Sequence, residues 1–159
     1  MIETINKEQF DSIFYNPEKT MLKVSAEELS HFVENENVLK LKIANKKLLY
    51  QKAHDLSSTG AYEALEDLCQ INMDTLKKTI NGSIKITRNF IYKFTVGLHM
   101  TLEEANTFFE LNGGALRETC LADYICLHAL LDQDDIYQFI SDFELHTESK
   151  IGIRNRQSK

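Results

Sequence analysis

The chain has 159 residues, 43% of them hydrophobic, and a formal net charge of -6 at pH 7. This length and apolar content allow one compact domain with a real core, or a small domain with an appendage. Nowhere do 18 apolar residues run together, and the start, MIETINKEQF, has no continuous apolar stretch. We therefore expect neither a signal peptide nor a membrane span, and a cytoplasmic protein.

The composition indicates an all-α protein. The chain has one proline and six glycines, is rich in Leu, Glu, Lys and Ala, and lacks runs of alternating β-branched residues. These features favour helices over strands.

The cysteines and histidines form no metal-binding or catalytic pattern. Cys69, Cys120 and Cys126 are an odd set without CxxC spacing, and the five histidines are scattered. We expect buried reduced thiols and no metal site. A Gly-rich phosphate loop, a Gly-x-Ser-x-Gly motif and a His-Glu-x-x-His pair are all missing from the sequence. We therefore expect neither an enzyme nor a bound cofactor.

Charge is distributed unevenly along the chain. Residues 1–37 carry three Lys or Arg against eight Asp or Glu, and residues 38–99 carry ten against five. Residues 100–149 carry one against eleven, and residues 150–159 carry four against none. The basic middle segment is compatible with a polyanionic partner, although a solvated lysine face is the commoner origin of such an excess.

The first part of the chain reads as an acidic helical extension over residues 1–37. Residues 4–15 are predicted to form a helix that ends at the Asn-Pro pair which follows. Ser25 with Glu28 then forms a capping box, which predicts the start of a second short helix.

A further helix is predicted from Val38 to Leu56, with Leu41, Ala44, Leu48 and Leu49 at helical spacing. Most of its lysines lie elsewhere on the helical wheel: Lys40, Lys42, Lys46, Lys47 and Lys52. Four more helices are predicted, separated by only a few residues, over 61–70, 73–80, 88–98 and 102–111.

The stretch LEDLCQINMDTLKKTINGSIKITRNFIYKFTVGLHMTLEEA resembles the helix-turn-helix domains of the Cro and phage-repressor (XRE-like) family, over about residues 45–112. In that family a leucine opens the motif, an isoleucine or leucine eleven residues later anchors the recognition helix, and Asn-Gly ends it. Leu65, Leu76 and Asn81-Gly82 match these positions. The resemblance implies a lambda-repressor-like five-helix domain over residues 38–112, with a capping box of Thr101 and Glu104 before its last helix.

The sequence departs from the family pattern at several positions. Glu66 replaces the usual alanine, Ile86 the usual proline, and Ala61 and Tyr62 stand where a glutamine or serine commonly braces the DNA backbone. Gln70 replaces a glycine that often has a left-handed backbone, which would cost about 1 kcal/mol for a glutamine. Either that turn is kept at this cost, or it is remodelled.

The resemblance also implies a DNA-binding surface. Asn72 would cap the recognition helix, and four residues would face the major groove: Met73, Asp74, Lys77 and Lys78. Lys85 and Arg88 would contact phosphates, and Asn81 and Ser83 would add polar reach. Each also has a structural explanation, because Asp74 suits a first helical turn, lysines suit any exposed helix face, and Asn81 suits a helix end.

A helical hairpin is predicted over residues 113–149, followed by a basic flexible tail over residues 150–159. Its first helix is apolar around most of its circumference, so we expect His128 to be packed in the core. Its second helix has a one-sided stripe of Ile136, Phe139, Ile140 and Phe143. The apolar residues of the first helix exceed one packing face, which predicts dimerisation through Leu121, Ile125, Leu127 and Leu131.

The sequence therefore predicts a DNA-binding transcriptional regulator of XRE-like type. It would act as a homodimer on double-stranded DNA, because one short recognition helix contacts too few base pairs to be selective. The alternative is an adaptor or inhibitor, for example one encoded by a phage or mobile element, that binds a protein partner. Such a protein would use its acidic helical surface, whose charge resembles that of phosphates.

Overall fold

The computed structural model of the protein describes residues 25–153, and this part of the chain is helical and contains no strand. The prediction of an all-α protein is thereby confirmed for the described residues. The chain divides into two compact units, residues 1–35 and residues 36–159, which we describe separately. The helix predicted over residues 4–15 lies outside the described residues. None of the described helices is long and apolar enough to cross a membrane.

The described part of the first unit contains the start of helix α2 (Ala26–Ala53). The Ser25 N–H donates to Glu28 Oε1 and the Glu28 N–H donates to Ser25 Oγ, both at 3.0 Å, which confirms the predicted capping box. The helix then continues past residue 38, because it contains no glycine or proline that would interrupt it. The prediction of two separate helices in this region was wrong.

The side of α2 that faces the core also differs from the prediction. Leu39 and Ile43 are fully buried and Lys47 is 9% exposed, whereas Leu41 and Leu49 are 60% and 61% exposed. Apolar residues occur on both sides of this helix, so their spacing alone did not identify the buried side.

Lys47 can occupy a core-facing position because its ammonium group has hydrogen-bond partners and an aromatic ring beside it. Its ammonium group donates to Gln51 Oε1 and Ser58 Oγ, both at 2.9 Å, and lies 4.4 Å from the centre of the Tyr62 ring. The aliphatic stem of a lysine can cover apolar surface while its ammonium group stays hydrogen-bonded. Burial lowers the pKa of Lys47.

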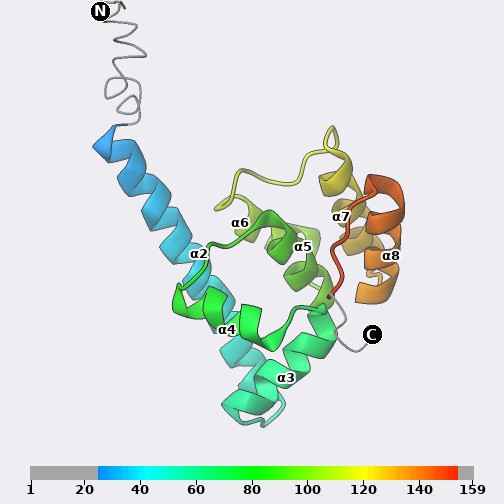
Figure 1. The fold of residues 1–159 in the computed structure, drawn as a ribbon, viewed down its shortest axis with the longest axis horizontal. Helices are drawn as coiled ribbons and strands as arrows, with labels where there is room; N and C mark the ends of the chain where they lie inside the picture. Colours follow the sequence, from blue (N-terminus) through cyan, green and yellow to red (C-terminus); the bar gives the residue numbers. More distant parts are fainter. Residues whose placement is uncertain (1–24, 154–159) are drawn as a thin grey trace, which may run out of the picture. The chain divides into compact units, whose positions relative to one another are not determined.

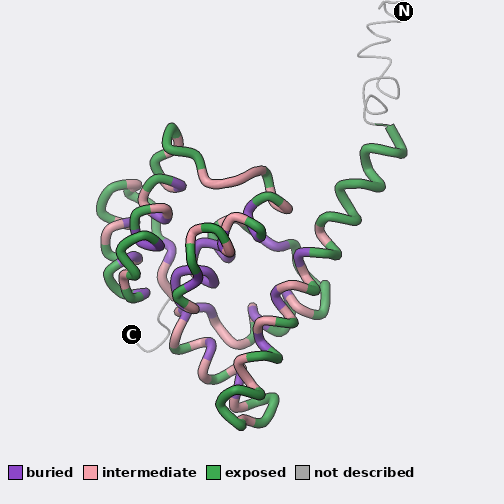
Figure 2. The backbone as a smooth tube through the Cα atoms, turned by 180° about the vertical axis from the view of Figure 1, so that it is seen from behind, coloured by how far each residue is buried: buried purple, intermediate pink, exposed green. Residues whose placement is uncertain are grey.

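Helix α5 is the centre of the second unit (Figure 1), and buried residues gather around it (Figure 2). Seven of its ten residues are buried. The helices near it have bounds close to those predicted: α3 (Ser58–Cys69), α4 (Met73–Asn81), α5 (Arg88–Gly97) and α6 (Leu102–Phe109). Leu65 and Leu76 are fully buried in the same core. The thiols of Cys69 and Cys126 are buried and free, as expected, and Cys120 is half-buried.

The turn between α3 and α4 keeps a left-handed backbone at Gln70, with φ 54° and ψ 46°. Of the two possibilities that the sequence left open, this is the one observed. The Gln70 side-chain amide donates to Tyr137 Oη at 3.1 Å, and the backbone carbonyl oxygen of Gln70 accepts from Lys93 Nζ at 2.8 Å. These contacts help to offset the cost of the left-handed conformation. After α4, Gly82 has a φ of 87°, which confirms the predicted helix end.

At the start of helix α6, one of the two hydrogen bonds of the predicted capping box forms. Thr101 Oγ1 accepts from the Glu104 N–H at 3.1 Å. The Glu104 carboxylate forms an ion pair with Lys46 Nζ at 2.9 Å instead, which links α6 to α2.

The two helices of the predicted hairpin are α7 (Leu121–Asp132) and α8 (Ile136–Thr147). Ile136, Phe139 and Phe143 are buried, which confirms the apolar stripe on α8. The Tyr92 ring on α5 lies 6.4 Å from the Phe139 ring and 5.7 Å from the Phe143 ring, between centroids. Aromatic contacts therefore join the hairpin to the central helix.

His128 is exposed, so the prediction that it packs in the core was wrong. Its ring lies 4.5 Å from that of Tyr124, in an edge-on arrangement at 61°. The buried residues of α7 are Asp123, Cys126, Ala129 and Leu130. A buried aspartate thus lies on the core side of the helix, and the side with His128 faces outward.

The chain beyond α8 packs back on that helix. Ile151 is buried, and the N–H groups of Ile151 and Gly152 both donate to Glu144 Oε2 at 2.8 Å. These hydrogen bonds lower the pKa of Glu144. The first residues of the segment predicted as a flexible tail are therefore held on α8, and residues 154–159 lie outside the described residues.

Gly97 determines how closely α5 approaches α3. A Cβ atom at this position would lie 2.6 Å from Leu68 O and 2.7 Å from both Cα and Sγ of Cys69. We expect Gly97→Ala to force the two helices apart and to lower the free energy of unfolding by about 2 kcal/mol or more, as measured by urea denaturation.

The control variant is Gly60→Ala. Its Cβ would lie 3.1 Å from Ser57 Oγ, which belongs to a side chain. We expect a change of less than about 1 kcal/mol, because alanine also favours the helix. Equal losses in the two variants would show that the approach of α5 to α3 is not limited at Gly97.

Candidate nucleic-acid interface

Helix α4 is anchored by one side and presents the other to solvent. Leu76 and Thr79 are buried. Asp74 is followed three and four residues later by the exposed Lys77 and Lys78, and these are followed four and three residues later by the exposed Asn81, so the four residues share one side of the helix. The structure thus brings four of the predicted DNA-binding residues together.

The two lysines of α4 have different surroundings. Lys78 Nζ lies 3.2 Å from Asp74 Oδ2 in an exposed ion pair. Lys77 Nζ lies 5.4 Å from the centre of the Tyr62 ring, and Lys47 Nζ lies 4.4 Å from the same centre. Tyr62 therefore gathers cations from α2 and α4 next to the exposed side of α4.

Lys40 is a further cation that the sequence did not assign to this surface. A Cβ atom added at Gly82 would lie 3.0 Å from Lys40 Nζ, so the ammonium group lies against the turn that follows α4. Lys85 is exposed shortly after the same turn. No local pattern relates Lys40 and Lys47 to α4, because they lie more than twenty residues earlier and only the packing of α2 brings them near.

The polar residues after α4 interact with each other. Asn81 Oδ1 accepts from the Ser83 N–H at 2.9 Å and from Ser83 Oγ at 2.6 Å. This pair fixes the exit from the helix, and both residues remain exposed.

The start of α4 is capped differently from the prediction. Among the described residues, Asn72 stands at the N-cap position, but its side chain makes no capping hydrogen bond. Glu66 Oε2 accepts from the Met73 N–H at 3.1 Å instead. Glu66 therefore provides the capping hydrogen bond, and Asn72 holds the predicted N-cap position without one. Asn72 and Met73 are themselves half-buried.

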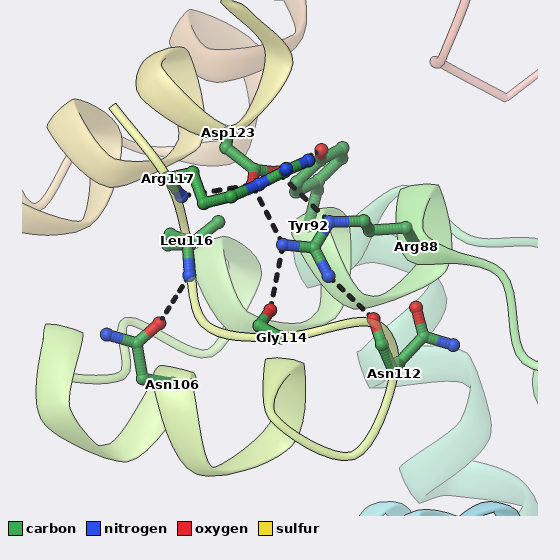
Figure 3. Close-up of polar contacts among 8 residues, drawn as sticks. All are labelled: Arg88, Tyr92, Asn106, Asn112, Gly114, Leu116, Arg117 and Asp123. Atoms are coloured by element: carbon green, nitrogen blue, oxygen red, sulfur yellow. Dashed lines mark hydrogen bonds and ion pairs between the residues drawn. The ribbon is translucent and has the colours of Figure 1, made fainter. Parts of the chain in front are cut away.

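Arg88 points into the protein, away from its predicted place at the phosphates. Its Nε and one terminal nitrogen donate to the two carboxylate oxygens of Asp123 at 3.0 and 2.8 Å. The guanidinium group also donates to the carbonyl oxygens of Asn112, at 2.6 Å, and Gly114, at 3.0 Å (Figure 3). These four hydrogen bonds are all internal, so Arg88 does not belong to the candidate interface.

Asp123 is fully buried at the centre of this network (Figure 3). Tyr92 Oη donates to it at 2.5 Å, and the Arg117 N–H donates at 3.1 Å. Burial by itself would raise the pKa of Asp123, but the hydrogen bonds from Arg88 and Tyr92 outweigh it and hold the pKa below its ordinary value. Burial and the bond to Asp123 raise the pKa of Tyr92.

The acidic hairpin lies away from α4. In both views α7 and α8 are on one side of α5, and α2 and α4 are on the other (Figures 1 and 2). Residues 118–149 contain no lysine or arginine. The second unit therefore has a basic side and an acidic side.

A groove of about 330 Å³ lies between α7 and α8, and we call it the α7–α8 groove. Its lining residues are Leu121, Tyr124, Ile125, His128, Ala129, Asp132, Asp134, Asp142 and His146. Burial, and then the charges of Asp132, Asp142 and Asp135, raise the pKa of Asp134. Within the described residues, no group of side chains could hold a metal ion.

The four residues predicted to mediate dimerisation do not lie on one common surface. Leu121 and Ile125 line the α7–α8 groove. Leu127 is half-buried and Leu131 is 57% exposed, both outside that lining.

No protein-family model matches the chain, and comparisons with curated proteins and with solved structures give no significant match.

The Arg88–Asp123 pair gives a prediction about stability and pH. Asp123→Asn removes the charge that balances the part-buried guanidinium group, and we expect it to lower the free energy of unfolding by about 3 kcal/mol at pH 7. Because the pKa of Asp123 is lowered in the folded state, its contribution is present at neutral pH and lost on acidification below about pH 4. Urea denaturation between pH 7 and pH 3 measures both effects.

Asp67→Asn is the control, since Asp67 is exposed on α3. It should change stability by less than about 0.5 kcal/mol at either pH. A stability gap between wild type and Asp123→Asn that stayed constant down to pH 3 would contradict the proposed charge balance.

Proposed function

We propose that the protein binds double-stranded DNA through the exposed side of α4 and regulates transcription, as members of the XRE-like family do. The observation that carries this proposal is the position of Lys77 and Lys78. They lie on the free side of a short helix, and the acidic hairpin lies on the other side of α5. An exposed polar helix with adjacent cations has the chemistry needed to enter a major groove.

The side chains of α4 have complementary partners on DNA. Lysine can donate to guanine or to phosphate, and Asp74 can accept from the N4 amino group of cytosine. The ion pair between Lys78 and Asp74 is exposed, so separating it costs at most about 1 kcal/mol. Asn81 and Ser83 would remain available for further polar contacts at the end of the helix.

A lysine outside α4 would add a phosphate contact. Lys40 lies against the turn after α4, and within α4 the ammonium group of Lys77 lies near the Tyr62 ring. Phosphate contacts of this kind orient a protein on the duplex and make its affinity depend on salt. Tyr62 stands where the family commonly braces the DNA backbone with a glutamine or serine, and here it would do so indirectly by holding the ammonium group of Lys77.

Lys77→Ala/Lys78→Ala should weaken DNA binding at least tenfold without unfolding the protein, because both side chains are exposed. The slope of log affinity against log salt should fall by about 2, since each lost phosphate contact removes about 0.9. Fluorescence anisotropy with labelled genomic fragments at several salt concentrations measures both quantities.

Lys150→Ala is the matched control, because this exposed lysine lies beyond α8. It should bind DNA as the wild type does. Wild-type affinity and salt slope in the double variant would show that α4 does not contact DNA.

A protein-binding adaptor remains the second candidate. The α7–α8 groove and the absence of Lys and Arg from residues 118–149 favour it, since such a surface would repel DNA and attract a basic protein. If the wild-type protein binds no fragment even at low salt, the DNA-binding proposal fails and this function takes its place.

A further inference from the structure

Helix α2 has an apolar side that is left exposed by the rest of the described residues, 25–153. We call this side the α2 face, and it consists of Val38, Leu41, Lys42, Asn45, Leu48, Leu49 and Lys52. Its four apolar side chains are between 42% and 61% exposed. These residues recur at helical spacing opposite the buried Leu39 and Ile43, so they form one continuous strip.

The charge on the α2 face has a single sign. Residues 37–53 contain five lysines and no carboxylate. Lys52 is exposed at the end of the strip, and Lys42 lies at its edge with its ammonium group 5.2 Å from the centre of the Phe108 ring. The α2 face is therefore a basic amphipathic helix surface.

The α7–α8 groove has the opposite character. Leu121, Ile125 and Ala129 supply apolar walls, and the carboxylates of Asp132, Asp134 and Asp142 lie along it. Among the described residues of this hairpin there is no lysine or arginine to neutralise them, since the sequence has none between residues 118 and 149. The groove therefore combines apolar area with mutually repelling negative charges.

Neither surface suits pairing with itself. Two α7–α8 grooves placed together would bring aspartates against aspartates, and two α2 faces would bring lysines against lysines. Like charges placed opposite one another at an interface cost several kcal/mol. The groove also repels a nucleic acid. A basic amphipathic helix is complementary to the groove in charge and in apolar surface. The α2 face of a second copy of this chain is such a surface.

We propose that the α2 face of one copy docks in the α7–α8 groove of a second copy. Leu41 and Leu48 then cover the apolar walls, and Lys42 and Lys52 lie beside the groove carboxylates. The two lysines are about 15 Å apart along the helix axis, at 1.5 Å per residue. Helix α7 has twelve residues and is therefore about 18 Å long, so the lengths match.

The contact joins two different surfaces of the chain. Helices α2 and α7–α8 lie on different sides of α5 (Figures 1 and 2), so each copy keeps one free α2 face or one free groove after a single contact forms. Such head-to-tail association extends into a chain of copies or closes into a ring. It does not depend on DNA, and it replaces symmetric dimerisation through the hairpin.

Variants that each damage one surface provide the test. Leu41→Asp/Leu48→Asp damages the α2 face, and Asp132→Lys/Asp142→Lys damages the groove. Light scattering without DNA at low salt should show the wild-type mass rising with concentration and each variant alone remaining monomeric. An equimolar mixture of the two variants should form a species of two chains, because each variant retains the surface that the other lacks.

Glu110→Lys/Glu118→Lys is the matched control for the groove variant. It makes the same change in charge at two exposed positions before α7 and should assemble as the wild type does. Circular dichroism establishes that all variants are folded.

Three results would overturn the proposal. The wild type could stay monomeric up to about 1 mM, which would place the dissociation constant above the millimolar range. The mixture of variants could stay monomeric, or the groove variant could still form dimers. Since DNA is absent, each of these leaves the DNA-binding proposal standing. Loss of DNA binding in Lys77→Ala/Lys78→Ala likewise leaves the assembly proposal untouched.

Discussion

The buried pair of Arg88 and Asp123 is the interaction on which the arrangement of the second unit depends. It connects the first residue of α5 with α7, and it also holds the backbone at Asn112 and Gly114. A fully buried carboxylate is tolerable when its charge is balanced and its oxygens are hydrogen-bonded, and here Arg88, Tyr92 and the Arg117 N–H meet both conditions. The hairpin is therefore fastened to the central helix by charge as well as by apolar contact.

This pair also determines which side of α7 faces the solvent and which cations lie beside α4. Because Asp123 faces inward, α7 turns its other side, with Leu121 and His128, toward the α7–α8 groove. Because Arg88 faces inward, the cations beside α4 come from lysines of α2 and α4 instead. The pair thus keeps one carboxylate of the hairpin and one cation of α5 inside the protein.

Local sequence signals predicted the helices well. Capping residues, the Asn-Gly pair and apolar spacing predicted α3 to α6 within a few residues, since these features act within one or two turns. Gln70 shows a limit of such local signals. Its left-handed backbone was one of two possibilities, and the contacts with Lys93 and Tyr137 that support it come from α5 and α8.

The candidate site was predicted only in part, because local sequence signals do not show which distant residues a side chain will contact. Asp74, Lys77 and Lys78 could be placed on one side of α4 because helical geometry fixes their relation. The inward direction of Arg88 depends on Asp123, which lies 35 residues later, and the burial of Lys47 depends on Ser58 and Tyr62. An arginine or lysine has the same local pattern whether its charge faces solvent or a buried partner, so only the tertiary structure distinguishes the two.

The contacts of Gln70 have a consequence for communication between the two sides of the domain. The turn that sets the direction of α4 is bonded to Tyr137 on α8, and α8 forms one wall of the α7–α8 groove. A ligand of the groove that shifts α8 would therefore act on the same turn as a ligand of α4. Thermodynamic linkage makes such an effect reciprocal, so occupancy at either site would change the affinity of the other by the same factor.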